Sequence, residues 1–313
     1  MNVGQLLADA ARRHPERPAV TWGDRRLDYR SLDRRTNALA RALAGLGASR
    51  GDRVGVLMRN RPEMLEAMFA CFKGGFCLVP LNSRFTAEEV AYHVEDSGAV
   101  AVLTDDEGAD VVLDATTRFR DRVRVVVAGD EVPAAGVASH DGLIDEVDDS
   151  PATVPVDRDD LAWLFYTSGT TGRPKGAMLT HANLAFATAS WLADLTPMTE
   201  HDVTLHAAPL SHGAGFHALA ATARGAHQVI PYASRFDPAG ILGLFAAHRV
   251  TNTWMVPTQI VMLLDHVGDH APALPALQRV VYGGAPFAPA DLRRALEVFG
   301  PCSCSSTRRA RRR

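Results

Sequence analysis

Short apolar runs alternate with helical patterns along almost the whole chain, and this alternation restricts the fold more than any other feature of the sequence. Helix signals stand between the runs: Thr86-Ala87-Glu88-Glu89 is a capping box, Asp237-Pro238 places an N-cap before a first-turn proline, and an amphipathic stretch over 31–46 stops at Gly47. Such a pattern predicts an α/β fold with a largely parallel sheet flanked by helices. The predicted strands are 53–58, 77–81, 100–104, 122–128, 161–167, 203–210, 228–232, 253–256 and 280–282.

Several of these strands end at proline or glycine. Pro80 and Pro209 lie at the ends of two of them, Pro257 follows a third, and Gly283-Gly284-Ala285-Pro286 follows a fourth. Such residues end a strand and open a loop at the carboxyl edge of the sheet, where α/β folds bind their ligands. We therefore expect the functional site along this edge.

The most unusual loop follows the strand predicted at 161–167. Residues 167–176 read Thr-Ser-Gly-Thr-Thr-Gly-Arg-Pro-Lys-Gly and include Lys175, one of only two lysines in the chain. Backbone N–H groups, hydroxyl donors and a compact positive charge in one loop suit an anion such as a phosphate chain. Composition alone would equally permit a mobile Gly/Thr surface loop. As a phosphate loop it is expected between a strand ending near Tyr166 and a helix beginning near His181.

Two familiar phosphate-binding motifs do not match this loop. The G-x-x-x-x-G-K-[ST] pattern fails because Pro174 precedes the lysine and Gly176 follows it, where Ser or Thr would bind magnesium. A G-x-G-x-x-G pattern follows none of the predicted strands. If the loop binds phosphate, it therefore belongs to neither of these two classes.

The composition excludes several broad classes of protein. A net charge of −3 gives no general affinity for nucleic acid. No apolar run is long enough to span a bilayer, and Asp9 and Arg12-Arg13-His14 interrupt the opening stretch, unlike in a signal peptide. Four cysteines are too few for a disulfide framework at this length, so we expect a cytoplasmic protein.

The stretch 166–181 closely resembles the signature of the adenylate-forming (AMP-binding) enzymes, which include acyl-CoA synthetases, luciferases and the adenylation domains of peptide synthetases. Further resemblances follow in the family's order at 25–51, 74–82, 209–213 and 282–286, so that about residues 1–301 are covered. The resemblance implies the family's large N-terminal domain, with mixed or parallel sheets flanked by helices. Gly-Gly-Ala-Pro at 283–286 is similar to acyl-CoA synthetases, whereas peptide synthetases usually carry Gly-Gly-Glu-Ala there.

The implied activity is that of an ATP-dependent acid–thiol ligase of the type found in fatty acid metabolism. A small-molecule carboxylic acid attacks the α-phosphorus of ATP, pyrophosphate leaves, and the acyl-adenylate passes to a thiol, so ATP, Mg²⁺ and coenzyme A are implied. His212 resembles the family histidine beside the acyl and thiol channel. The residues implied in nucleotide binding are Thr167, Ser168, Gly169, Thr170, Thr171, Gly172, Lys175, Gly283, Gly284, Ala285 and Pro286.

His212 lies in a stretch unusually rich in histidine, together with His201, His206, His217 and His227. A metal cluster is conceivable there, but no H-E-x-x-H or comparable spacing occurs, and no metal site is predicted. Only His212 has motif support, and the others are expected to be packing or surface residues. Trp254-Met255 and 261–264 are likewise expected in the core more than in an acyl-pocket wall.

The sequence departs from the family after Pro301. Relatives continue into a Tyr-Gly-x-Thr-Glu segment that contacts adenine and supplies a metal-binding Glu, whereas 302–313 is rich in serine and arginine. The ribose-binding Asp and the C-terminal catalytic Lys have no counterpart, and Lys73 lies in a different motif. We therefore expect a partial N-terminal domain over 1–301, a disordered tail over 302–313, no certain catalytic residue, and little or no activity.

Three functions stay open on these grounds. The first is an acyl-CoA synthetase by descent, and the second is a non-catalytic module that binds a nucleotide or an acyl ligand. The third is an unrelated NTPase with a novel loop. Pyrophosphate release separates the first from the second, and ATP hydrolysis without a carboxylic acid would indicate the third.

Overall fold

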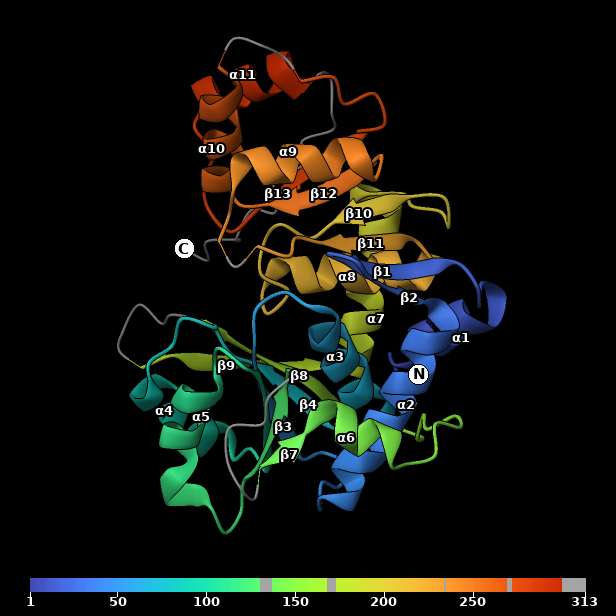
Figure 1. Cartoon of the computed structure of the whole chain (residues 1–313), viewed down its shortest axis with the longest axis vertical. Helices are drawn as coiled ribbons and strands as arrows, with labels where there is room; N and C mark the ends of the chain where they lie inside the picture. Colours follow the sequence, from blue (N-terminus) through green and yellow to red (C-terminus); the bar gives the residue numbers. More distant parts are fainter. Residues whose placement is uncertain (130–136, 168–172, 234, 269–271, 300–313) are drawn as a thin grey trace. The chain divides into compact units, whose positions relative to one another are not determined.

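A computed structural model describes residues 1–129, 137–167, 173–233, 235–268 and 272–299 (Figure 1). The contacts divide the chain into two units. The first unit consists of Met1–Glu16 and Tyr29–Ala187, and the second of Arg17–Asp28 together with the described residues from Thr188 onward. Each unit is built around its own sheet. The predicted single domain over 1–301 stays a prediction, and the predicted tail over 302–313 lies outside the described residues.

The sheet of the first unit has seven strands among the residues described, in the order β7-β6-β5-β3-β4-β8-β9. Neighbouring strands are parallel except for β8 and β9, which form an antiparallel pair. The inner strands are mostly apolar, with charged or polar residues at their ends, because helices cover both faces of a parallel sheet. The strands are β3 (Arg53–Leu57), β4 (Cys77–Pro80), β5 (Ala101–Asp105), β6 (Arg124–Ala128), β7 (Ala138–Ser139), β8 (Leu161–Thr167) and β9 (Lys175–Thr180).

Helices flank this sheet, with α4 and α5 on one face and α3 and α6 on the other (Figure 1). The predicted capping box of α4 is confirmed: the Thr86 hydroxyl accepts a hydrogen bond from the Glu89 amide, and the Glu89 carboxylate accepts one from the Thr86 amide. The helices are α1 (Gln5–Arg13), α2 (Tyr29–Gly45), α3 (Pro62–Gly74), α4 (Ala87–Ser97), α5 (Ala109–Thr116), the short η1 (Thr117–Phe119), α6 (His140–Asp145) and α7 (His181–Ser190), whose last residues belong to the second unit.

The sheet of the second unit has the order β13-β12-β10-β11-β1-β2, and only β1 and β2 pair antiparallel. Its apolar core contains residues of the sheet and of the helices α9, α10 and α11. The Asp237 carboxylate caps α9 as predicted, because it accepts hydrogen bonds from the amides of Ala239 and Gly240. The strands are β1 (Pro18–Trp22), β2 (Arg25–Asp28), β10 (Val203–Leu205), β11 (His227–Ile230), β12 (Asn252–Met255) and β13 (Arg279–Tyr282). The helices are η2 (Trp191–Leu195), α8 (Gly213–Arg224), α9 (Pro238–Ala247), α10 (Pro257–Val267) and α11 (Pro289–Phe299).

Every predicted strand is present, within one to three residues at most ends. The prediction for 203–210 is wrong in its second half, because β10 ends at Leu205 and the chain then leaves the sheet. The loop predicted over 167–176 is too long at its second end, because Lys175 and Gly176 already belong to β9, which runs to Thr180. Lysine and glycine are poor strand formers, so it is the pairing with β8 that makes this stretch a strand. Within the part of the chain that is described, no helix has the length and apolar character needed to cross a membrane.

Candidate functional site

The two legs of the predicted phosphate loop leave and re-enter the sheet of the first unit side by side. Thr167 is the last residue of β8, Lys175 is the first of β9, and the two are directly opposed in the antiparallel register. Directly opposed residues point to the same face of a sheet. The Thr167 hydroxyl and the exposed Lys175 ammonium group therefore share one face. The predicted binding residues Ser168, Gly169, Thr170, Thr171 and Gly172 lie outside the described residues.

The base of this hairpin leaves little room for a side chain at Gly176. Gly176 is opposed to Tyr166, and a Cβ atom at Gly176 would lie 3.2 Å from ring atoms of Tyr166. The ring therefore lies over the glycine backbone, and the Tyr166 hydroxyl donates a hydrogen bond to Oδ2 of Asp96 at 2.6 Å. Burial and the neighbouring Asp96 carboxylate raise the pKa of Tyr166, so the phenol stays protonated as a donor.

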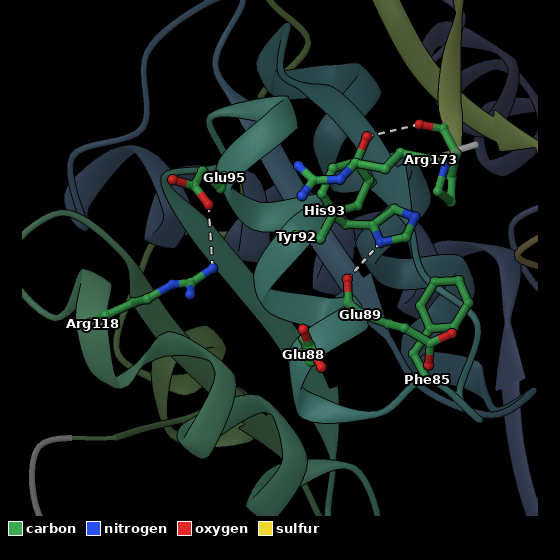
Figure 2. A pocket seen from close by; sticks show the side chains of 9 residues that line it. Phe85, Glu88, Glu89, Tyr92, His93, Glu95, Arg118 and Arg173 are labelled. Atoms are coloured by element: carbon green, nitrogen blue, oxygen red, sulfur yellow. Dashed lines mark hydrogen bonds and ion pairs between the residues drawn. The ribbon is translucent and has the colours of Figure 1, made fainter. Parts of the chain in front are cut away.

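Helix α4 and the second leg of the loop enclose a cavity of about 430 Å³ (Figure 2). The Tyr92 hydroxyl donates a hydrogen bond to the Pro174 carbonyl oxygen at 2.9 Å, and the Arg173 guanidinium lies 5.4 Å from the centre of the Tyr92 ring. Sequence reasoning missed Tyr92, because nothing in the pattern of α4 distinguishes it from other half-buried helix positions. The lining residues are Phe85, Glu88, Glu89, Tyr92, His93, Glu95, Arg118, Arg173 and Pro174.

The predicted Gly-Gly-Ala-Pro segment follows β13 in the second unit. The amide of Gly283 donates to the Met255 carbonyl at 3.2 Å, so the segment starts beside the end of β12. Gly284 has a φ of +85°, a backbone conformation that side chains other than glycine rarely adopt. Gly284, Ala285 and Pro286 are exposed, so this backbone is accessible to a ligand at the carboxyl edge of the sheet.

His212 lies at the same edge of the same sheet. It occupies the N-cap position of α8, reached by the chain that leaves β10, and its Nδ1 is 2.9 Å from the Ser211 hydroxyl oxygen. Burial lowers the pKa of His212, so the imidazole is neutral at pH 7. Because β12 pairs with both β10 and β13, the segments that contain His212 and 283–286 follow two strands that are separated by one strand.

Tight packing holds this edge together. A Cβ atom at Gly213 would lie 2.6 Å from Cζ2 of the buried Trp254, and the Gln259 amide donates to the Ala207 carbonyl at 2.9 Å. The core positions predicted at Trp254 and Met255 are confirmed by their burial. The glycine after His212 is therefore required because the helix start packs directly against an indole ring.

Gly213→Ala is expected to lower the free energy of unfolding by about 1–3 kcal/mol, the usual cost of overpacking a buried contact. Urea unfolding followed by circular dichroism measures it. Gly243→Ala in α9 is the matched control, since a Cβ there meets nothing within 4 Å and alanine should instead stabilise the helix by about 0.5–1 kcal/mol. Equal effects of the two substitutions would contradict the packing argument.

The other histidines of this stretch include two buried packing residues, as predicted. The His206 Nε2 and the Gln228 Oε1 are 2.9 Å apart, and the His217 ring stacks on Trp191 with centroids 5.4 Å apart. Burial lowers the pKa of His206 to about 4 and that of His217 well below its usual value, so both are neutral. Over the described ranges, no group of three or more His, Cys, Asp or Glu side chains is arranged to hold a metal ion.

Lys73 is a structural residue. Its ammonium group is fully buried and donates three hydrogen bonds to side chains of α2. The acceptors are the Asp33 carboxylate at 2.6 Å, the Thr36 hydroxyl at 2.7 Å and the Asn37 side-chain oxygen Oδ1 at 2.7 Å. Burial lowers the pKa of Lys73 to about 8, and Asp33 opposes this shift, so the amine is protonated at pH 7. The two lysines of the chain therefore differ: Lys73 joins α3 to α2, and Lys175 is exposed at the hairpin.

Comparison with known proteins agrees with this arrangement. A family model described as AMP-binding enzyme matches residues 7–307. The chain is 37% identical over 294 residues to a feruloyl-CoA synthase from Amycolatopsis sp, covering 93% of this chain and 55% of that protein. It is 29% identical over 303 residues to a medium/long-chain-fatty-acid–CoA ligase of Mycobacterium tuberculosis, covering 95% of this chain and 52% of that protein. The chain thus spans about half the length of the curated relatives it matches.

Solved structures show the same fold. The inhibitor-bound N-terminal domain of FACL13 from Mycobacterium tuberculosis matches with a TM-score of 0.84 and 27% identity, covering 97% of this chain and 74% of that chain. The anthranilate CoA ligase AuaEII in complex with anthranoyl-AMP matches with a TM-score of 0.86 and 23% identity, covering 98% of this chain and 59% of that chain. The chain therefore belongs to the AMP-binding enzyme family.

Proposed function

We propose that this chain binds ATP and a carboxylic acid as the nucleotide-binding part of a carboxylate–CoA ligase, whose first half-reaction forms an acyl-adenylate, and that little or no turnover accompanies this binding. The observation that carries the proposal is the β8–β9 hairpin, which presents Thr167 and the exposed Lys175 on one face at the mouth of the family's signature loop. Enzymes of this family use ATP, Mg²⁺ and coenzyme A in general. Coenzyme A supplies the thiol that displaces AMP from the acyl-adenylate.

In the proposed reaction a carboxylate oxygen attacks the α-phosphorus, and the bond to the β-phosphate oxygen breaks as pyrophosphate leaves. Lys175 and Thr167 would balance the negative charge of the outer phosphates. In the second unit taken by itself, the exposed backbone at Gly284–Pro286 and the neutral His212 are the groups that the family resemblance assigns to adenine or the acyl group. The described residues do not define a Mg²⁺ site, so we assign no Mg²⁺ ligand.

We further propose that the acid is an aromatic hydroxycinnamic acid such as ferulate. Support comes from the two feruloyl-CoA synthases, from Amycolatopsis sp and Streptomyces sp, which are each 37% identical to this chain. A fatty acid is the competing substrate class, favoured by the 29% identical medium/long-chain-fatty-acid–CoA ligase and by a 32% identical fatty acid–[acyl-carrier-protein] ligase from Streptomyces coeruleorubidus.

The test is calorimetric titration of the 313-residue chain with ATP, AMP and two stable adenylate mimics, feruloyl- and dodecanoyl-sulfamoyl adenosine. We expect both nucleotides to bind, and the feruloyl mimic to bind about tenfold or more tightly than the dodecanoyl mimic, because shape and polar contacts in the acid pocket decide between them. Tighter binding of the dodecanoyl compound would contradict the aromatic substrate and indicate that the substrate is a fatty acid. Failure of all four compounds to bind would contradict the proposed function.

Turnover is measured separately as pyrophosphate release from ATP with ferulate. Slow release that depends on the acid supports a ligase, fast release would contradict the expected low turnover, and binding without any release would indicate a non-catalytic module. ATP hydrolysis without any acid would contradict both.

A further inference from the structure

Both legs of the hairpin that carries Lys175 are attached to one helix, α4. On the first leg, the Tyr166 hydroxyl donates to the Asp96 carboxylate at 2.6 Å, and the Tyr166 ring meets the edge of His93 with centroids 4.5 Å apart. On the second leg, the Tyr92 hydroxyl donates to the Pro174 carbonyl at 2.9 Å. The two tyrosine hydroxyls bond in opposite directions, one from the hairpin to the helix and one from the helix to the hairpin.

The contact at Pro174 acts directly on Lys175. The Pro174 carbonyl and the Lys175 amide belong to the same planar peptide unit, so fixing the carbonyl oxygen orients the peptide that leads into Lys175. The Arg173 guanidinium over the Tyr92 ring adds a second contact to the same leg. Figure 2 shows Arg173 beside Tyr92, and both residues line the cavity.

Helix α4 is a rigid support for these contacts. Its start is held by the Thr86–Glu89 capping box, and Val90 and Val94 are buried in the core of the first unit. His93, next to Tyr92, is stacked on Phe85 with centroids 4.7 Å apart. A movement of Tyr92 would therefore require repacking of the helix.

We propose that Tyr92 is a positioning residue, which acts through the Pro174 carbonyl to hold Lys175 in place for the outer phosphates of ATP. The proposal rests on the proposed function for the identity of the ligand, but the attachment of the hairpin to α4 is independent of it. Tyr92 itself touches no nucleotide in this scheme. Its effect on ATP passes entirely through Lys175.

The test variant is Tyr92→Phe, which removes one hydroxyl group and leaves the ring under Arg173. Tyr232→Phe is the matched control, because Tyr232 is an exposed tyrosine of the second unit whose ring packs on Trp22. Without nucleotide, amide hydrogen exchange in the peptide that contains Lys175 and Gly176 should be about two- to tenfold faster in Tyr92→Phe, the range set by one intramolecular hydrogen bond. It should be unchanged in Tyr232→Phe.

The second measurement is a double-mutant cycle in ATP binding. Tyr92→Phe should weaken ATP about two- to tenfold and leave AMP unchanged, and it should have no further effect when Lys175 is already alanine. Unchanged hydrogen exchange would overturn the attachment to α4, whatever happens to binding. Equal weakening of ATP and AMP, or an undiminished effect in the Lys175→Ala background, would overturn the positioning role. If the wild-type chain binds no ATP, the proposed function fails and the exchange measurement still decides the attachment.

Discussion

Lys73→Ala is expected to lower the free energy of unfolding by about 3–5 kcal/mol, the cost of removing one partner from a buried ion pair. The substitution leaves the acceptors of Asp33, Thr36 and Asn37 without their shared donor, and it opens a cavity between α2 and α3. Urea unfolding at pH 7, followed by circular dichroism, measures the loss. Such a loss is a large fraction of the free energy of unfolding of an ordinary domain, which is about 5–15 kcal/mol.

Two further variants separate the loss of the hydrogen bonds and charge from the cavity as causes of the lower stability of Lys73→Ala. Lys73→Met keeps most of the volume and removes the charge, so a large loss in this variant identifies the unpaired acceptors as the main cost. Lys175→Ala changes an exposed lysine and should alter the free energy of unfolding by no more than about 0.5 kcal/mol. A loss below about 1 kcal/mol for Lys73→Ala would mean that water replaces the ammonium group, and the structural role would be wrong.

Lys175→Ala is expected to weaken ATP binding about 10- to 100-fold, the range for one hydrogen bond to a charged group. AMP should be little affected, because the proposed partners of Lys175 are the outer phosphates that AMP lacks. The effect should shrink as salt rises, since Lys175 is exposed and its charge is screened. Paired calorimetric titrations of ATP and AMP into the wild type and the variant give the comparison.

Met178→Ala is the control for this experiment, because Met178 is an exposed residue of the same strand β9 with no charge to offer. Lys175→Arg keeps the charge but changes its shape, and should retain part of the affinity. Equal loss of ATP and AMP in Lys175→Ala would make Lys175 a structural residue. If Lys175→Ala bound ATP with the affinity of the wild type, the loop would be a plain Gly/Thr connection without a role in phosphate binding.

Local patterns were sufficient for most of the fold. Strands such as β8 and helix starts such as Thr86 and Asp237 depend on residues that are close together in the chain, so their signals are complete in a short window of sequence. The same holds for the placement of His212 and Gly283–Pro286 at one sheet edge, because parallel strands that end in loops share that edge. The family signature at the hairpin is also a local feature.

Interactions between distant residues could not be predicted in this way. Strand β9 exists because it pairs with β8, and β1 joins the sheet of the second unit by pairing with β11, about two hundred residues away. The sequence contains two lysines in different motifs, and no local pattern distinguishes their roles. The packing of α3 against α2 buries Lys73 among three side-chain acceptors on α2. Likewise, Tyr92 and Pro174 are far apart in the chain, and it is the position of α4 beside the hairpin that joins them. Short-range propensity therefore determined most of the elements, whereas pairing and burial between distant segments added strands such as β9 and decided which side chains are structural and which are presented to a ligand.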